Sequence, residues 1–284
     1  MGIVCALLPA LFWGFMPLIV KKVGGRPTNG ILGTVMGALI VGILIQLGTH
    51  PQAINWQTFL VSMFAGACWV IGQVGQFAAY NKISVTTTMP ISTALQLIGT
   101  SLIGVFVFGE WPSMFSKIVG FGDIILLIIG VALTTVGGEK GNNHRNMKQG
   151  LAILLLTSIG YWIYSAVPKA IHVPGTAMFF PQMLGAFLAA AVYVLLVDRH
   201  TFVEKKTWKN IIAGILWSIA AFLYIIAAKQ IGIATAFTIT QLCVVISTLG
   251  GIVFLHEHKN ARELRFTLFG LALVVLGSFI TAFL

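Results

Sequence analysis

Long apolar stretches, separated by short polar connections, run through the whole chain. Ten of them approach or exceed the roughly 20 residues that a helix needs to cross the hydrocarbon core of a bilayer. They cover residues 2–20, 30–48, 57–80, 84–108, 114–136, 149–170, 176–197, 208–228, 233–255 and 264–283. The pattern predicts an all-α integral membrane protein with ten transmembrane helices. The first stretch has no basic leader, so we expect it to be a span and not a signal peptide.

Charged residues are scarce, which supports the same interpretation. Asp, Glu, Lys and Arg make up 8% of the chain and hydrophobic residues 58%, whereas a soluble domain has about 25% charged and about 45–50% apolar residues. The 3 cysteines lie in separate apolar stretches, without the spacing of a zinc site. We therefore expect no disulfide framework, no metal and no cofactor. Enzyme motifs such as HExxH and GxSxG are absent, so we do not expect an enzyme.

The basic residues predict the orientation in the membrane. The net charge is +10, and 14 of the 17 basic residues lie in the connections that follow the odd-numbered stretches: Lys21, Lys22, Arg26, Lys82, Lys140, Arg145, Lys148, Arg199, Lys205, Lys206, Lys209, Lys259, Arg262 and Arg265. The opposite connections hold Lys117, Lys169 and Lys229. Because short loops rich in Lys and Arg stay in the cytoplasm, both termini are predicted to be extracellular. The basic excess is then a topology signal, and no nucleic-acid partner is expected.

The two halves of the chain resemble each other. At shifts of 147 to 149 residues, Glu110 corresponds to Glu257, Gly37-Ala38 to Gly185-Ala186, Trp69 to Trp217 and Trp13 to Trp162. Apolar helices can resemble one another by composition alone, but these landmarks agree within two residues. We expect a first five-helix repeat at 1–137, a cytoplasmic linker at 138–148 and a second five-helix repeat at 149–284. An odd number of helices inverts the second repeat, and inverted repeats are typical of transporters.

Several runs resemble the bacterial glucose/ribose uptake porters of the drug/metabolite transporter superfamily. They are LPALFWGFMP (8–17), GALIVG (37–42), TTTMPISTALQLIGTSLIGVFVFGEW (86–111), GYWIYSAVP (160–168) and QLCVVISTLGGIVFLHE (241–257). The resemblance covers nearly the whole chain. It implies two inverted five-helix halves, sugar uptake and coupling to protons. It also implies that helices 1–4 and 6–9 surround the substrate while helices 5 and 10 lie behind them.

A polar stripe in the third stretch is the clearest candidate for substrate binding. Trp69, Gln73, Gln76 and Tyr80 are spaced so that they share one helix face. An amide in hydrocarbon needs a partner, and it offers both the donor and the acceptor that a sugar hydroxyl can use. A Trp ring suits the apolar face of a pyranose. The alternative is that both glutamines only bond neighbouring helices.

Other polar and aromatic residues inside the stretches are weaker candidates for substrate binding. They are Thr88, Ser92 and Gln96 in the fourth stretch, Gln241 in the ninth, and Trp13, Tyr164, Gln182 and Trp217. Hydroxyls in helices often bond the carbonyl one turn back, and we favour that interpretation for Thr88 and Ser92.

Proton coupling has one candidate in the middle of a stretch, Asp123. The family resemblance does not include it, and it could instead be a buried polar pair or line a dimer face. Glu110 and Glu257 end the fourth and ninth stretches, where carboxylates more often cap helices or form gate ion pairs.

The pattern as a whole predicts a secondary active transporter. It would import a monosaccharide, glucose ahead of ribose, across the bacterial cytoplasmic membrane by alternating access, as a monomer or homodimer. Export or uniport of another small metabolite, such as an amino acid or purine, is the alternative. A channel is a further alternative, and nothing in the chain resembles an ATP-binding loop.

Overall fold

The computed structural model describes residues 2–108, 113–134, 144–171, 173–231, 240, 242–257 and 259–282. Within those residues all regular structure is helical, as the hydropathy pattern predicts. The long helices are α1 (Gly2–Val23), α2 (Pro27–Thr49), α3 (Trp56–Ile83), α4 (Val85–Phe108), α5 (Met114–Thr134), α6 (His144–Ile171), α7 (Gly175–Val197), α9 (Ile211–Ile231), α11 (Leu242–Phe254) and α12 (Ala261–Ala282). Two short elements, η1 (Arg199–Val203) and α8 (Lys205–Lys209), connect α7 to α9.

The helices begin and end close to the limits of the apolar stretches. Among the described helices, α2, α3, α4, α5, α6 and α7 are long and apolar enough to cross a membrane. Helix α6 starts at His144 and not at 149, because polar residues can continue a helix beyond the hydrocarbon. The stretch predicted at 233–255 corresponds to α11, while 232–239 and 241 lie outside the described residues. Apolarity predicts neither η1 nor α8, which lie in a polar connection.

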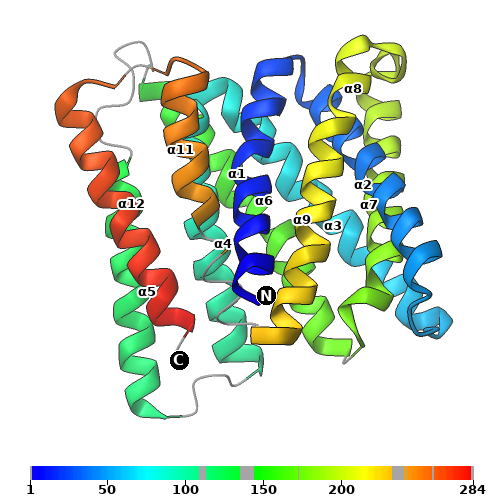
Figure 1. Cartoon of the computed structure of the whole chain (residues 1–284). Coiled ribbons are helices and arrows are strands. Elements are labelled where there is room, and N and C mark those ends of the chain that lie inside the picture. Colours follow the sequence, from blue (N-terminus) through cyan, green and yellow to red (C-terminus); the bar gives the residue numbers. More distant parts are fainter. Residues whose placement is uncertain are drawn as a thin grey trace.

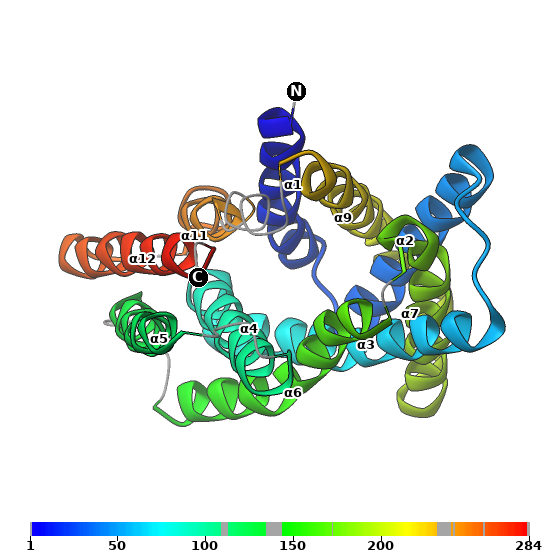
Figure 2. The same ribbon diagram turned by 90° about the horizontal axis from the view of Figure 1, so that it is seen from below.

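Helices far apart in the chain lie side by side (Figure 1). Helix α3 packs on α6 and α7, α1 packs on α9 and α11, and α2 packs on α7 and α9. Seen from below, α1, α3, α4, α9 and α11 are arranged around the middle of the bundle (Figure 2). Helices α5 and α12 pair with each other at one edge.

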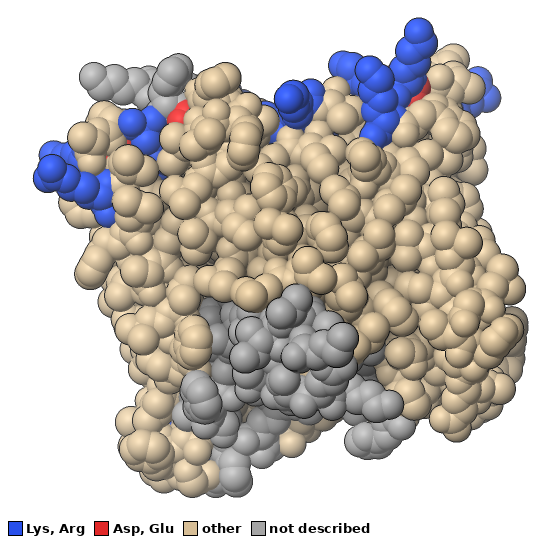
Figure 3. All heavy atoms as spheres, in the orientation of Figure 1, with Lys and Arg blue, Asp and Glu red and all other residues tan. Residues whose placement is uncertain are grey.

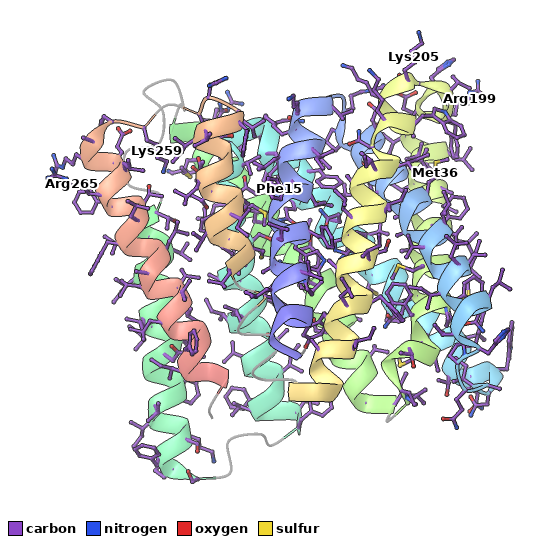
Figure 4. All side chains as sticks on the ribbon, viewed as in Figure 1. Phe15, Met36, Arg199, Lys205, Lys259 and Arg265 are labelled. Carbon is purple, nitrogen blue, oxygen red and sulfur yellow. The ribbon has the colours of Figure 1, made fainter. Side chains whose placement is uncertain are left out.

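One end of the bundle is basic. Lys and Arg side chains gather at the top of Figure 3, and Figure 4 labels Arg199, Lys205, Lys259 and Arg265 among them. We call this end the basic face. Helix α1 begins and α12 ends away from it (Figure 1). The described basic residues of the alternate connections thus share one side of the bundle, as their spacing in the sequence predicts.

At the basic face, ion pairs and hydrogen bonds connect the segment between α7 and α9 to the start of α2. Arg26 forms ion pairs with Asp198 and Glu204. Asn29 Nδ2 donates to Glu204 Oε2 over 2.6 Å and to the Thr207 hydroxyl over 3.0 Å. Asn29 Oδ1 also accepts from the backbone N–H of Arg26, which caps α2. The two bonds that Asn29 Nδ2 donates join segments that are more than 170 residues apart.

Lys259 joins the α5–α12 pair near the same face. Its Nζ donates to the Thr134 carbonyl over 3.1 Å and to the Thr267 hydroxyl over 2.7 Å. Burial lowers the pKa of Lys259, while the nearby carboxylates of Glu263 and Glu257 oppose that shift. The lysine thereby ties the end of α5 to the start of α12.

Glycines let the helices cross closely. A Cβ at Gly37 of α2 would lie 2.7 Å from the Ile215 backbone nitrogen, and one at Gly214 of α9 would lie 2.7 Å from the Thr34 carbonyl carbon. No Cβ fits at such a distance from rigid backbone. Small residues at helix crossings are the usual means of close packing in membranes, and here they set the separation of α2 and α9.

We expect Gly214→Ala to lower the unfolding midpoint of the purified protein in detergent. Overpacking a tight contact costs about 1–3 kcal/mol, and here the contact is backbone. Gly122 of α5 is the matched control, because a Cβ there meets nothing within 4 Å. Gly122→Ala should be neutral or stabilising by up to about 1 kcal/mol through helix propensity. Equal midpoints for the two variants in a thermal unfolding assay would contradict the crossing.

Candidate functional site

Amide, aromatic and thioether side chains from four helices meet inside the bundle. We call this group the central cluster, and it consists of Trp69, Gln73, Gln76, Met89, Tyr161 and Trp217. Trp69, Gln73 and Gln76 come from one face of α3, as their spacing predicts. Helix α6 supplies Tyr161, α4 supplies Met89 and α9 supplies Trp217.

Tyr161 bonds both amides of α3. Its hydroxyl lies 2.9 Å from Gln73 Oε1 and 2.5 Å from Gln76 Oε1. All three side chains are buried, where an unpaired amide is costly. Close approach of α6 makes these bonds possible, because a Cβ at Gly72 would lie 2.7 Å from the Tyr161 ring.

The thioether sulfur of Met89 accepts two further hydrogen bonds from side chains of α3. Gln76 Nε2 donates to Met89 Sδ over 2.9 Å, and the Tyr80 hydroxyl donates to the same sulfur over 3.1 Å. Tyr80 and Met89 are buried as well. The polar stripe of α3 is therefore bonded to α6 on one side and to α4 on the other.

The two tryptophans join helices that pack mainly on other neighbours. The rings of Trp69 and Trp217 have centroids 4.4 Å apart at 39°. Trp13 Nε1 donates to the Trp217 carbonyl over 3.1 Å, and its ring lies 6.0 Å from that of Tyr224. Tyr164 packs against the same apolar group as Trp69 and Trp217. Tyr164 and Trp217 thus pack with Trp69 of the α3 stripe, and Trp13 joins them through Trp217.

The hydroxyl groups of Thr88 and Ser92 on α4 form hydrogen bonds with residues one turn away in the chain. Thr88 donates to the Ser84 carbonyl one turn back over 2.6 Å. Ser92 Oγ accepts from Gln96 Nε2 over 3.3 Å. Gln96 is half-buried, and its neighbour Leu95 offers its carbonyl to Trp162 Nε1 over 2.9 Å. For Thr88 the bond one turn back is the one we favoured from the sequence.

Three further candidates lie elsewhere. Gln182 is buried where α7 crosses α3, and a Cβ at Gly66 would be 3.0 Å from its Cα. Asp123 is buried in α5 facing α12, where a Cβ at Gly277 would lie 2.8 Å from Oδ1. Gln241 lies outside the described residues. The structure therefore does not place Asp123 with the central cluster.

Glu257 bonds the beginning of α4 from across the chain. Its Oε1 accepts from the Val85 backbone N–H and its Oε2 from that of Thr86, each over 2.9 Å. These N–H groups have no partner within α4 and carry the positive end of the helix dipole. A Cβ at Gly251 would lie 2.8 Å from Oε2, so glycine is needed for the carboxylate to fold back. The carboxylate is buried and joins α11 to α4 near the basic face.

A single residue, Ser84, connects α3 to α4. Its φ is 68°, which is uncommon for a residue other than glycine. Its hydroxyl lies 3.1 Å from that of Thr86 and 3.3 Å from that of Thr87. Helices α3 and α4 are thus held at one short corner beside Glu257.

Sequence reasoning missed the roles of Tyr161, Met89 and Glu257. Tyr161 is recognisable only as an aromatic residue inside a span. Met89 looks like one apolar residue among many, with Pro90 after it as the only local signal. Glu257 is recognisable as a carboxylate at the end of a span that can cap a helix, but its partner Val85 lies 172 residues away.

Comparisons with known proteins agree with the architecture. A family described as "Sugar transport protein" matches residues 4–284. A "Putative sugar uptake protein" of Lactobacillus johnsonii is 47% identical, covering 99% of each chain. A "Putative ribose uptake protein RbsU" of Staphylococcus epidermidis is 38% identical, covering 100% of this chain and 98% of its own. A solved crystal structure at 17% identity shares the fold, with a TM-score of 0.68 over 98% of this chain and 95% of that one.

The family match extends over nearly all of the chain, and the relatives align over their full length. The resemblance seen in the sequence is confirmed at the family level. Together with the apolar helices, it establishes a multi-pass membrane protein. The chain belongs to the sugar transport protein family.

Proposed function

We propose that the protein is a secondary active transporter that imports a monosaccharide by alternating access, with the central cluster as its sugar site. The observation that carries the proposal is the meeting of two amides, a phenol and a Trp pair, all inside apolar helices that come from both halves of the chain. Amides supply donors and acceptors for hydroxyl groups, and a Trp ring covers the apolar face of a pyranose. Substrate sites near the bilayer midplane are typical of secondary transporters.

The chemistry of the cluster favours a neutral substrate. Its polar groups are amides, a phenol and a thioether, none of which pairs with the charges of an amino acid. This supports a monosaccharide over amino-acid export, the alternative class. Relatives carry both sugar and ribose in their names, and we place glucose ahead of ribose because the Trp pair suits a six-membered ring.

We place the basic face in the cytoplasm. The clustering of Lys and Arg supports this orientation, with both termini outside. The halves at 1–137 and 149–284 would then be inverted repeats, as the recurrence of Trp69 at Trp217 suggests. Trp69 and Trp217 meet in the central cluster, which is what symmetry-related residues around a shared site would do.

Contacts between the halves are consistent with closure at the basic face. Glu257 bonds the start of α4, and Arg26 pairs with Asp198 and Glu204. Within the first half, Lys21 Nζ also donates to the Tyr80 carbonyl over 2.8 Å, which joins α1 to α3 at the same face. We assign these contacts to a state that is closed toward the cytoplasm and must open there to release sugar.

Purified protein in proteoliposomes should accumulate labelled glucose, and ribose more weakly, when a pH gradient is imposed. Accumulation that is indifferent to the gradient would identify a uniporter and contradict proton coupling. If Asp123 carries the proton, Asp123→Asn should abolish gradient-driven accumulation and leave sugar exchange intact. Normal accumulation in that variant would place the proton site elsewhere.

Gln73→Ala should weaken glucose binding by about 5- to 100-fold. A lost hydrogen bond leaves a partner unsatisfied at about 1–3 kcal/mol, and about 1.4 kcal/mol corresponds to a factor of ten. Gln149→Ala is the matched control, because Gln149 bonds Lys82 at the basic end of α6. Titration calorimetry on monodisperse samples measures both, and wild-type affinity in Gln73→Ala would remove α3 from the site.

Glu257→Gln should open the basic face more often. Bonds to a charged group contribute about 1.5–3 kcal/mol, so we expect labelling of Cys243, buried on α11, to be about 10-fold faster. An impermeant maleimide added to inside-out vesicles, with Cys5 and Cys68 replaced by Ser, measures the rate. Glu263→Gln is the control, because the hydrogen bonds described for Glu263 are local bonds to Asn260. Equal rates in both variants would show that Glu257 does not hold the closed state.

A further inference from the structure

Met89 occupies an unusual place in the hydrogen bonding of the central cluster. Two good donors, the Gln76 amide and the Tyr80 hydroxyl, both point at its sulfur over 2.9 and 3.1 Å. A thioether is a weak acceptor. Gln76, Tyr80 and Met89 are 6%, 2% and 6% exposed, so bulk water does not supply a stronger acceptor in this conformation.

The sulfur fixes which way the Gln76 amide faces. A thioether accepts and never donates, so the amide must present Nε2 to Met89 and Oε1 to Tyr161. The single O–H of Tyr161 cannot serve both amide oxygens. It is donated to Gln76 over 2.5 Å, and turning the Gln73 amide by half a rotation makes its Nε2 the donor in the 2.9 Å contact. Every bond then has a donor, and the chain of bonds ends at Met89.

A weak acceptor at the end of this chain has a specific use. If Gln76 and Tyr80 bonded a carbonyl or a carboxylate, a ligand would have to break strong bonds to reach them. Bonded to sulfur, both donors avoid being unsatisfied while the site is empty, yet they are released at low cost. Methionine is unbranched and turns easily about its side-chain bonds, so the sulfur can withdraw without any movement of the backbone.

We propose that Met89 determines specificity by holding the place of a sugar hydroxyl, whose oxygen replaces the sulfur as acceptor for Gln76 Nε2–H and the Tyr80 O–H. The inference rests on the sugar site proposed above and deepens it. It identifies the ligand group as a neutral hydroxyl that accepts two bonds at once. A substrate lacking a hydroxyl at that position leaves the sulfur in place and gains nothing from Gln76 or Tyr80.

Replacing the sulfur tests the inference in both directions. Met89→Leu keeps the volume but removes the acceptor, so the empty site loses the bonds that Gln76 Nε2 and the Tyr80 hydroxyl donate to the sulfur. We expect this variant to bind glucose about 3- to 10-fold more tightly than wild type. Met89→Gln supplies a strong acceptor that competes with the sugar, and we expect about 10-fold weaker binding. Met183→Leu, a buried methionine of α7 outside the cluster, is the control and should match wild type.

Calorimetric titration with glucose, ribose and a series of deoxyglucoses gives the affinities, on samples whose unfolding midpoints match wild type. One deoxy sugar should lose the gain from Met89→Leu, and that sugar identifies the hydroxyl. Unchanged or weaker glucose binding by folded Met89→Leu overturns the inference, and so does wild-type affinity in Met89→Gln. Failure of wild type to bind any monosaccharide would overturn the proposed function itself, which separates the two results.

Discussion

Polar groups in a hydrocarbon environment must find their partners within the protein, and this constraint shapes both the fold and the candidate site. Helices satisfy their own backbone, which accounts for the all-helical architecture. The buried polar side chains of α3 cannot rely on water. Gln73 and Gln76 therefore bond Tyr161 of α6, and Gln76 reaches Met89 of α4. Each bond requires a particular helix to lie at a particular distance.

Glycines make those distances possible. Gly72 leaves room for the Tyr161 ring, Gly75 for Thr157 and Gly251 for the carboxylate of Glu257. The glycines on α2 and α9 do the same for backbone crossings elsewhere in the bundle. The hydrogen bonds of the buried polar side chains thus depend on close helix packing, which the glycines permit.

The sequence predicts local features well and distant partners poorly. Apolar length places the helices within a few residues, and helical spacing identifies the Trp69–Gln73–Gln76 stripe, because both depend on neighbours along the chain. It cannot identify Tyr161 as the common partner of two amides, since that depends on where α6 crosses α3. Met89 carries no local signal at all, and the partner of Glu257 follows only from long-range packing. The short elements η1 and α8 escape prediction because they lie in a polar connection without an apolar pattern, and part of their hydrogen bonding comes from Asn29 of α2.

The corner at Ser84 links two contacts that lie at different depths. Glu257 bonds the first residues of α4, and Met89 stands one turn further along that helix, opposite Gln76. If the start of α4 moves as a rigid body, a change at either contact displaces the other. Thermodynamic linkage makes such coupling reciprocal: if an occupied site favours release of the carboxylate, release of the carboxylate favours occupancy by the same factor. In the proposed transporter, the one-residue connection at Ser84 would then link the hydroxyl bound beside Met89 to the equilibrium of the contact at Glu257.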